Sequence, residues 1–188
     1  MAITQSYVFT RPDTNNSFHN DTTSDIVSQF KTSREGYITS GKLSVTQTDS
    51  DDGLTRTVVA TFADLITFAD RDNYITIEFD NDFYWYTNAH NHQITSYTLS
   101  GIDAAFTCIT TYTFPSASLP IHDALVIGIN NQSTNNKLKN LVVEETVITV
   151  THQYDNATDF SENFWKDFTL TPDLHAAGVT RTIAYAMV

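Results

Sequence analysis

Residues 41–62, GKLSVTQTDSDDGLTRTVVATF, read as a β-hairpin, because both halves show the period-two alternation of half-buried strands. In the first strand Leu43 and Val45 share one face. The other face of that strand holds Ser44, Thr46 and Thr48. In the second strand the apolar face holds Leu54, Val58, Ala60 and Phe62, and Arg56 interrupts it. Between the strands, Asp52-Gly53 predicts a type I′ turn, in which both central residues need positive φ. A lone hairpin is marginal in water, so the flanking segments must cover its apolar face.

The composition is that of a globular protein with few charges. The chain has 188 residues, enough for one domain or two small ones, and 40% of them are hydrophobic. Charged residues make up only 17%, and Thr, Asn and Ser supply the remaining polar surface. The net charge of −12 disfavours binding to nucleic-acid phosphates and to an anionic membrane. No apolar run approaches the ~18 residues of a membrane span, and the start MAITQSYVF lacks the pattern of a signal peptide.

Secondary-structure signals in the first half follow the order βαββαβ. Residues 6–11 (SYVFTR) predict a strand that Pro12 ends. Thr23, Ser24 or Asp25 can cap a helix with its stop at Gly36. After the hairpin, residues 64–88 predict a helix in two pieces, with a competing strand signal at residues 74–77, and residues 94–99 predict a strand. The apolar positions of the two helical pieces are Leu65, Phe68 and Ala69, then Ile75, Phe79, Phe83 and Tyr86.

The second half approximates the same order. Residues 104–114, 138–143, 146–154 and 179–187 predict strands, and residues 122–129 are either helix or strand. A capping-box pattern at Asp159 and Glu162 precedes a helical stripe. That stripe consists of Phe160, Phe164, Trp165 and Phe168. Thr171-Pro172 then starts another helical turn.

This element order predicts an α+β chain of two tandem ferredoxin-like lobes, each an antiparallel sheet with helices on one face. The lobes are expected at residues 1–100 and 101–188, joined near Gly101, and the second is interpreted as a diverged duplicate of the first.

Candidate chemical sites have plainer interpretations. The sequence of residues 49–53 (DSDDG) resembles the start of a calcium loop, but Ala60 stands where the EF-hand needs its last acidic ligand, so a solvated hairpin tip is expected. His90 and His92 lack a nearby third metal ligand and are interpreted as a polar helix end. His152, with Asp155 close behind, is a weak candidate base on a strand face. We therefore predict no catalytic residue, no cofactor and no metal.

Two other features concern burial. The single cysteine, Cys108, falls in an apolar strand pattern and predicts a buried structural thiol. The aromatic segment Phe83, Tyr84, Trp85 and Tyr86 cannot direct every ring at one small core. We predict that this segment is an interface, with Trp85 buried by the second lobe or by a partner chain.

Several motifs resemble small virion proteins of tailed bacteriophages, particularly marine ones. The matching pieces are SYVFTRPDT (residues 6–14), Phe18, SDDGLTRT leading into VVATF (50–62), and NAHNHQIT (88–95). The resemblance covers about residues 6–96, and it departs at Gln93, where those proteins carry Gly before Ile. It implies a virion structural component, without placing it in capsid, neck or tail, and it carries no catalytic residue.

The sequence therefore predicts a non-enzymatic structural component of a tailed-phage virion, a capsid, neck or tail accessory protein. Its expected location is the virion, in many copies or as a homo-oligomer among other virion proteins, without nucleic-acid or membrane binding. The alternatives are a small dimeric monooxygenase-type enzyme of ferredoxin-like fold and a ligand-binding module.

Overall fold

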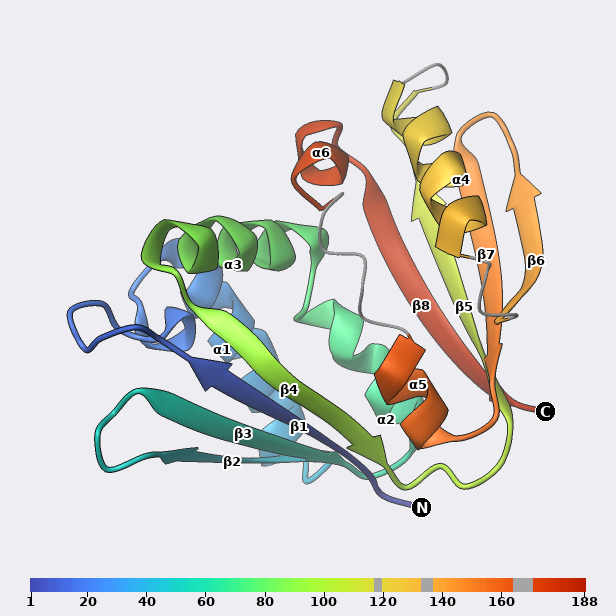
Figure 1. Cartoon of the computed structure of the whole chain (residues 1–188). Helices are drawn as coiled ribbons and strands as arrows, with labels where there is room; N and C mark the ends of the chain where they lie inside the picture. Colours follow the sequence, from blue (N-terminus) through green and yellow to red (C-terminus); the bar gives the residue numbers. More distant parts are fainter. Residues whose placement is uncertain (117–119, 133–136, 164–170) are drawn as a thin grey trace. The chain divides into compact units, whose positions relative to one another are not determined.

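The computed structural model describes residues 1–116, 120–132, 137–163 and 171–188. The chain divides into two compact units, Met1–Ile102 and Asp103–Val188, close to the boundary predicted at residue 100. Each unit is α+β and contains one four-stranded antiparallel sheet with helices (Figure 1). The chain therefore has the predicted fold class of tandem ferredoxin-like lobes.

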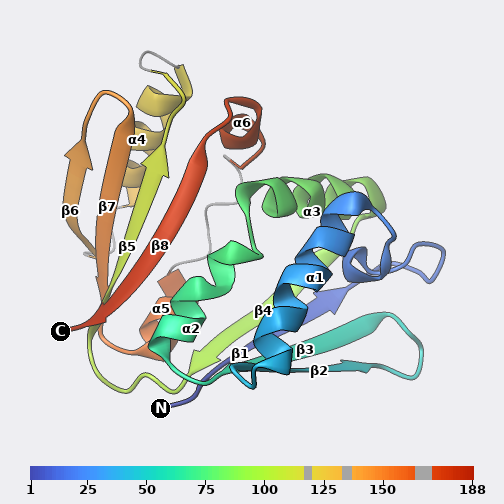
Figure 2. The ribbon, with the colours of Figure 1, turned by 180° about the vertical axis from the view of Figure 1, so that it is seen from behind.

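Unit 1 has the sheet order β2-β3-β1-β4, with every neighbouring pair antiparallel. In chain order its elements are β1 (Ile3–Thr10), η1 (His19–Asp21), α1 (Asp25–Thr39), β2 (Leu43–Asp49), β3 (Thr55–Phe62), α2 (Leu65–Ala69), η2 (Asp70–Asn73), α3 (Ile77–His90) and β4 (Gln93–Ser100). Figures 1 and 2 show α1 and α3 on one face of this sheet, which leaves the opposite face clear of the unit's own helices.

Unit 2 repeats this topology, with sheet order β6-β7-β5-β8 and antiparallel pairing throughout. Its described elements are β5 (Phe106–Thr113), α4 (Pro120–Gln132), β6 (Leu138–Val143), β7 (Val147–Tyr154), α5 (Ala157–Asn163), α6 (Thr171–Ala176) and β8 (Thr180–Met187). Helix α4 lies against one face of this sheet (Figures 1 and 2). Residues 122–129, for which the sequence predicts either helix or strand, are therefore helical.

Alternation along the strands builds the two cores. In unit 1 the buried side chains include Ile3, Leu43, Phe62 and Leu99 from the sheet and Val27, Phe30 and Phe79 from the helices. In unit 2 they include Phe106, Cys108, Ile148, Val150 and Tyr154 from the sheet and Leu125, Ile129 and Phe160 from the helices. Cys108 has no exposed surface, which confirms the prediction of a buried thiol.

The hairpin forms, but its predicted type I′ turn is wrong. Gly53 has a φ of 69°, whereas Asp52 is not in the left-handed region. The Gly53 N–H donates to the Ser50 carbonyl at 2.8 Å, so the chain turns over residues 50–53 before Gly53 adopts positive φ. The Asp52 carboxylate accepts from Ser50 Oγ and from the Leu54 N–H, at 2.6 and 2.9 Å. These local hydrogen bonds favour the longer loop over a two-residue turn.

Helix α1 begins as predicted but ends later. Its N-cap is Ser24, whose hydroxyl accepts from the Val27 N–H at 3.2 Å. Gly36 lies inside the helix, and the stop comes at Gly41, with a φ of 70°. The Lys42 N–H donates to the Tyr37 carbonyl and the Gly41 N–H to the Ile38 carbonyl, both at 3.0 Å. This is a Schellman ending, in which the left-handed residue is the glycine after the cap.

Two helix starts also differ from simple expectation. The strand signal at residues 74–77 gives way to helix α3, because the Thr76 hydroxyl caps it by accepting from the Phe79 N–H at 3.1 Å. Helix α5 starts before the predicted capping box: Asn156 Oδ1 accepts from the Asp159 N–H at 3.0 Å. The Asp159 carboxylate also accepts a hydrogen bond from the Asp155 N–H at 2.9 Å. Of the predicted stripe, Phe160 is buried, while Phe164, Trp165 and Phe168 lie outside the described residues.

Candidate contact surfaces

The sheet of unit 1 presents an uncharged face on the side away from α1 and α3, here called the unit 1 outer face. The strand registers and burial pattern assign alternate residues to it. These are Thr4, Ser6, Val8 and Thr10 of β1, Ser44, Thr46 and Thr48 of β2, Thr55, Thr57, Val59 and Thr61 of β3, and Gln93, Ser96, Thr98 and Ser100 of β4. Hydroxyls dominate it, and Thr4 Oγ1 lies 3.0 Å from Thr61 Oγ1.

The unit 2 outer face, defined in the same way, has the same character. Its residues are Thr107, Ile109, Thr111 and Thr113 of β5, Asn140 and Val142 of β6, Val147, Thr149, Thr151 and Gln153 of β7, and Thr180, Thr182, Ala184 and Ala186 of β8. In edge strand β6 an exposed Lys139 lies in the register irregularity between Leu138 and Asn140.

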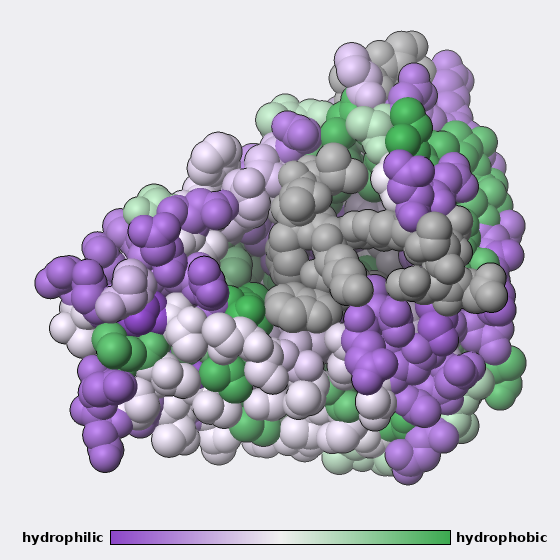
Figure 3. Space-filling model, in the orientation of Figure 1, coloured by the Kyte–Doolittle hydropathy of each residue, from purple (hydrophilic) through white to green (hydrophobic). Residues whose placement is uncertain are grey.

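Apart from Lys139, which lies in the register irregularity of β6, the charged residues of the described strands face the other way. Asp49 pairs with Arg56, and Arg181 pairs with Tyr112, all at positions on the helix-covered sides. In unit 1, whose strands are all described, no outer-face position holds Asp, Glu, Lys or Arg. Figure 3, which has the orientation of Figure 1, shows this as pale and green surface over β1–β4. The signal for this face is present in the sequence as Ser44, Thr46 and Thr48, which alternate with the apolar positions of β2.

Arg56 interrupts the apolar strand face because it holds three segments of unit 1 together. Its Nε and Nη2 donate to the two carboxylate oxygens of Asp49, at 2.6 and 2.7 Å. Its Nη1 lies 2.7 Å from Asp21 Oδ2 in η1. The guanidinium also lies 4.4 Å from the centroid of the Phe18 ring. The hydrogen bonds from Arg56 hold the pKa of the Asp49 carboxyl below its usual range.

The predicted aromatic interface divides between packing and exposure. Phe83 contacts Phe9 and His19, with ring centroids 6.0 and 5.2 Å apart, so it faces its own unit. The Tyr86 hydroxyl donates to the Ser17 carbonyl at 2.6 Å. Tyr84 packs edge-on against Trp85 at 5.5 Å. Trp85 itself is 59% exposed, so its burial by a partner stays a prediction.

The rings of His90 and His92 take part in aromatic packing in unit 1. His90 ends α3, and Asn91 follows it in the left-handed conformation with a φ of 54°, so the predicted polar helix end is confirmed. Tyr86 contacts the rings of both His90 and His92, at 4.5 and 5.6 Å. Burial, and then the neighbouring His90, lower the pKa of His92. Within the described residues, no group of three or more His, Cys, Asp or Glu is placed to hold a metal ion.

His152 lies on the helix-facing side of β7, opposite Cys108 in the strand register. Its Nδ1 is buried without a hydrogen-bond partner among the described residues, and burial lowers the pKa of the imidazole. Asp155 has its own role beyond the end of the strand, since its carboxylate lies 3.7 Å from Lys137 Nζ. Among the described residues, Asp155 therefore pairs with Lys137, and burial is the cause of the lowered pKa of His152. This arrangement does not support His152 as a base assisted by Asp155.

A second set of buried polar groups joins the sheet of unit 1 to its helical side. Arg71 Nη1 donates to Gln5 Oε1 at 3.1 Å, and both residues are buried. The Arg71 guanidinium also lies 4.2 Å from the centroid of Phe68. Burial raises the pKa of the nearby Tyr7 phenol well above its ordinary value. Because Gln5 and Arg71 are both more than nine-tenths buried, this cluster fits a structural role.

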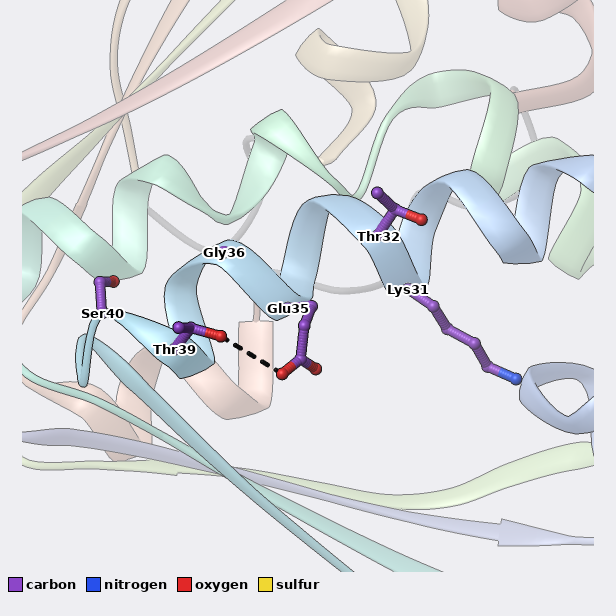
Figure 4. A pocket seen from close by; sticks show the side chains of 6 residues that line it. All are labelled: Lys31, Thr32, Glu35, Gly36, Thr39 and Ser40. Atoms are coloured by element: carbon purple, nitrogen blue, oxygen red, sulfur yellow. Dashed lines mark hydrogen bonds between the residues drawn. The ribbon is translucent and has the colours of Figure 1, made fainter.

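A shallow depression lies on the surface of α1. It is lined by Lys31, Thr32, Glu35, Gly36, Thr39 and Ser40 (Figure 4). All of these belong to one helix and its cap, and the polar contact drawn there joins Thr39 Oγ1 to Glu35 Oε1 at 3.4 Å. An open helix surface of this kind does not enclose a small molecule.

No protein-family model and no curated protein matches the chain. Among solved structures, the chain is similar to a protein from Lactobacillus acidophilus assigned as a monooxygenase, with 10% identity and a TM-score of 0.32, covering 100% of this chain and 93% of that one. It is also similar to a protein assigned as a glycine cleavage system transcriptional repressor, with 7% identity and a TM-score of 0.30, covering 100% and 98%. At these values no activity is transferred to this chain. In the described parts, no helix combines the length and apolar content that crossing a membrane requires.

Proposed function

We propose that this chain is a non-enzymatic structural protein of a larger assembly, and that its outer faces make the contacts with other proteins. The observation that carries this proposal is the lack of charged residues at the register-assigned positions of both outer faces, all of which are described. If charged residues occurred on these faces at the chain's average frequency of 17%, about five charged side chains would be expected there.

The physical reason is the cost of burying charge. Charged residues are depleted from the centres of protein interfaces, because a desolvated charge needs a partner. A sheet face that stays in water has no such restriction, and natural proteins use charges there to prevent association. Short hydroxyl side chains carry no charge and can be buried in an interface, since they can donate and accept hydrogen bonds across a contact.

The sequence resemblance to tailed-phage virion proteins makes a phage particle the assembly we propose, with other virion proteins as partners. The test is to purify particles of a phage that encodes this chain on a density gradient and to quantify the chain by mass spectrometry. We expect it to co-migrate with the particles in a fixed ratio to the major capsid protein. Recovery only from the soluble fraction of infected cells, with none in the particles, would contradict the proposal.

A further inference from the structure

We propose that the unit 1 outer face is the contact surface for a second copy of this chain, which packs the same face against it. This inference rests on the proposed function, since it takes the outer faces to be contact surfaces and names the partner of one of them. The occupant follows from the charge, the chemistry and the size of the face.

Charge restricts where two copies can meet. Each copy carries a net charge of −12, so surfaces rich in Asp and Glu repel each other when two copies approach. The unit 1 outer face carries no charge at its register-assigned positions. The bulge in its edge strand β4 also holds a neutral residue, Thr95, whereas the corresponding irregularity of the unit 2 sheet holds exposed Lys139. The unit 1 face is therefore the more completely neutral of the two.

The chemistry of the face is complementary to itself. Val8 lies opposite Thr57 and Val59 opposite Ser6, so the two valines are diagonal neighbours on the two central strands. Hydroxyl-bearing residues surround them on β2, β3 and β4. An apolar centre within a polar rim is the usual arrangement of an interface. Because each hydroxyl both donates and accepts, the same patch can pair with its own copy, as a two-fold contact requires.

The size of the face is sufficient for a reversible dimer. Four strands of eight or so residues, about 4.8 Å apart and rising about 3.4 Å per residue, cover roughly 500 Å². Two copies would bury roughly 1,000 Å² in total, near the lower limit for specific association. Packed sheets lie about 10 Å apart with strands within about 30° of parallel, a spacing that Val, Thr and Ser side chains can fill.

The test is sedimentation velocity of the purified full-length chain, from about 1 to 200 µM. The wild type is compared with Val59→Arg, at the centre of the face, and with Thr32→Arg, exposed on α1. Both variants make the same change in net charge and reduce the overall repulsion between copies. Only the first places a charge in the proposed contact.

We expect the wild type to form a reversible dimer. The dissociation constant of Thr32→Arg should stay within about threefold of the wild-type value, and that of Val59→Arg should rise at least about tenfold. Val59→Thr keeps the face neutral but removes part of its apolar centre, so it should weaken the dimer less than Val59→Arg does, and far-UV circular dichroism checks that each variant is folded. A wild-type chain that is monomeric throughout, or a dimer unaffected by Val59→Arg, would overturn the inference. A monomeric chain that is still found in particles would leave the proposed function standing, so the two failures can be told apart.

Discussion

Replacing Arg56 by Met should destabilise unit 1 by about 2–4 kcal/mol, because the change removes a buried cation from two carboxylates. The guanidinium makes two hydrogen bonds to Asp49 and one close ion-pair contact to Asp21, between 2.6 and 2.7 Å. Charged hydrogen bonds contribute about 1.5–3 kcal/mol each. The Asp49 and Asp21 side chains are 42% and 43% exposed, so water recovers much of that loss and the simple sum must be discounted. Met keeps apolar contact with Phe18 but cannot replace the cation.

The measurement is urea unfolding of Arg56→Met, Asp49→Asn and the double variant, followed by circular dichroism. We expect the two changes to be non-additive by about 1–2 kcal/mol, since they remove the same interaction. Lys31→Met, on the exposed side of α1, is the matched control and should stay within about 0.5 kcal/mol of the wild type. A loss below about 1 kcal/mol for Arg56→Met, or strict additivity with Asp49→Asn, would refute this reasoning.

Three further predictions concern the backbone and one histidine. Gly36→Ala should stabilise unit 1 by about 0.5–1 kcal/mol in urea unfolding, because Gly36 is helical and an added Cβ meets nothing within 4 Å; destabilisation would contradict the helical assignment. Gly53→Val should destabilise by about 1 kcal/mol or more, because Gly53 has a φ of 69°, and an unchanged melting temperature would count against the observed loop. Burial lowers the pKa of His152 in the folded chain, so on acidification this histidine is protonated more readily in the unfolded chain. The folded state is therefore favoured fully above about pH 6.5, and this stabilisation is lost as the pH falls below that value. His152→Asn should therefore make the stability less dependent on pH between about 7 and 5, and equal pH profiles would disprove this.

The fold class could be predicted because alternation and caps are local signals. The hairpin strands, the helical face of Val27 and Phe30, and the Ser24 cap all follow from residues a few positions apart. The same local signals failed at the end of α1. The sequence predicted a stop at Gly36, whereas the Schellman hydrogen bonds of residues 41 and 42 place it at Gly41.

The contact surfaces were harder to predict because they depend on pairing between distant strands. That Val8 neighbours Val59, or that Arg56 meets Asp21, requires the register of β1 with β3 and the position of η1. No short sequence window contains both partners. The aromatic segment shows the same limit: periodicity placed Phe83 toward its own unit, but it could not say whether a partner covers Trp85.

The outer faces can be tested directly by thiol accessibility, because the chain's one cysteine, Cys108, is fully buried and gives little background. Thr57→Cys and Thr149→Cys place a thiol on the unit 1 and unit 2 outer faces, and Thr32→Cys places one on α1 as a control. Maleimide labelling rates are compared between the dilute chain and the native assembly. We predict that both outer-face thiols react at least about tenfold more slowly in the assembly, while the Thr32→Cys control changes little. Equal labelling of the outer-face thiols in the dilute chain and in the assembly would contradict their role as contact surfaces.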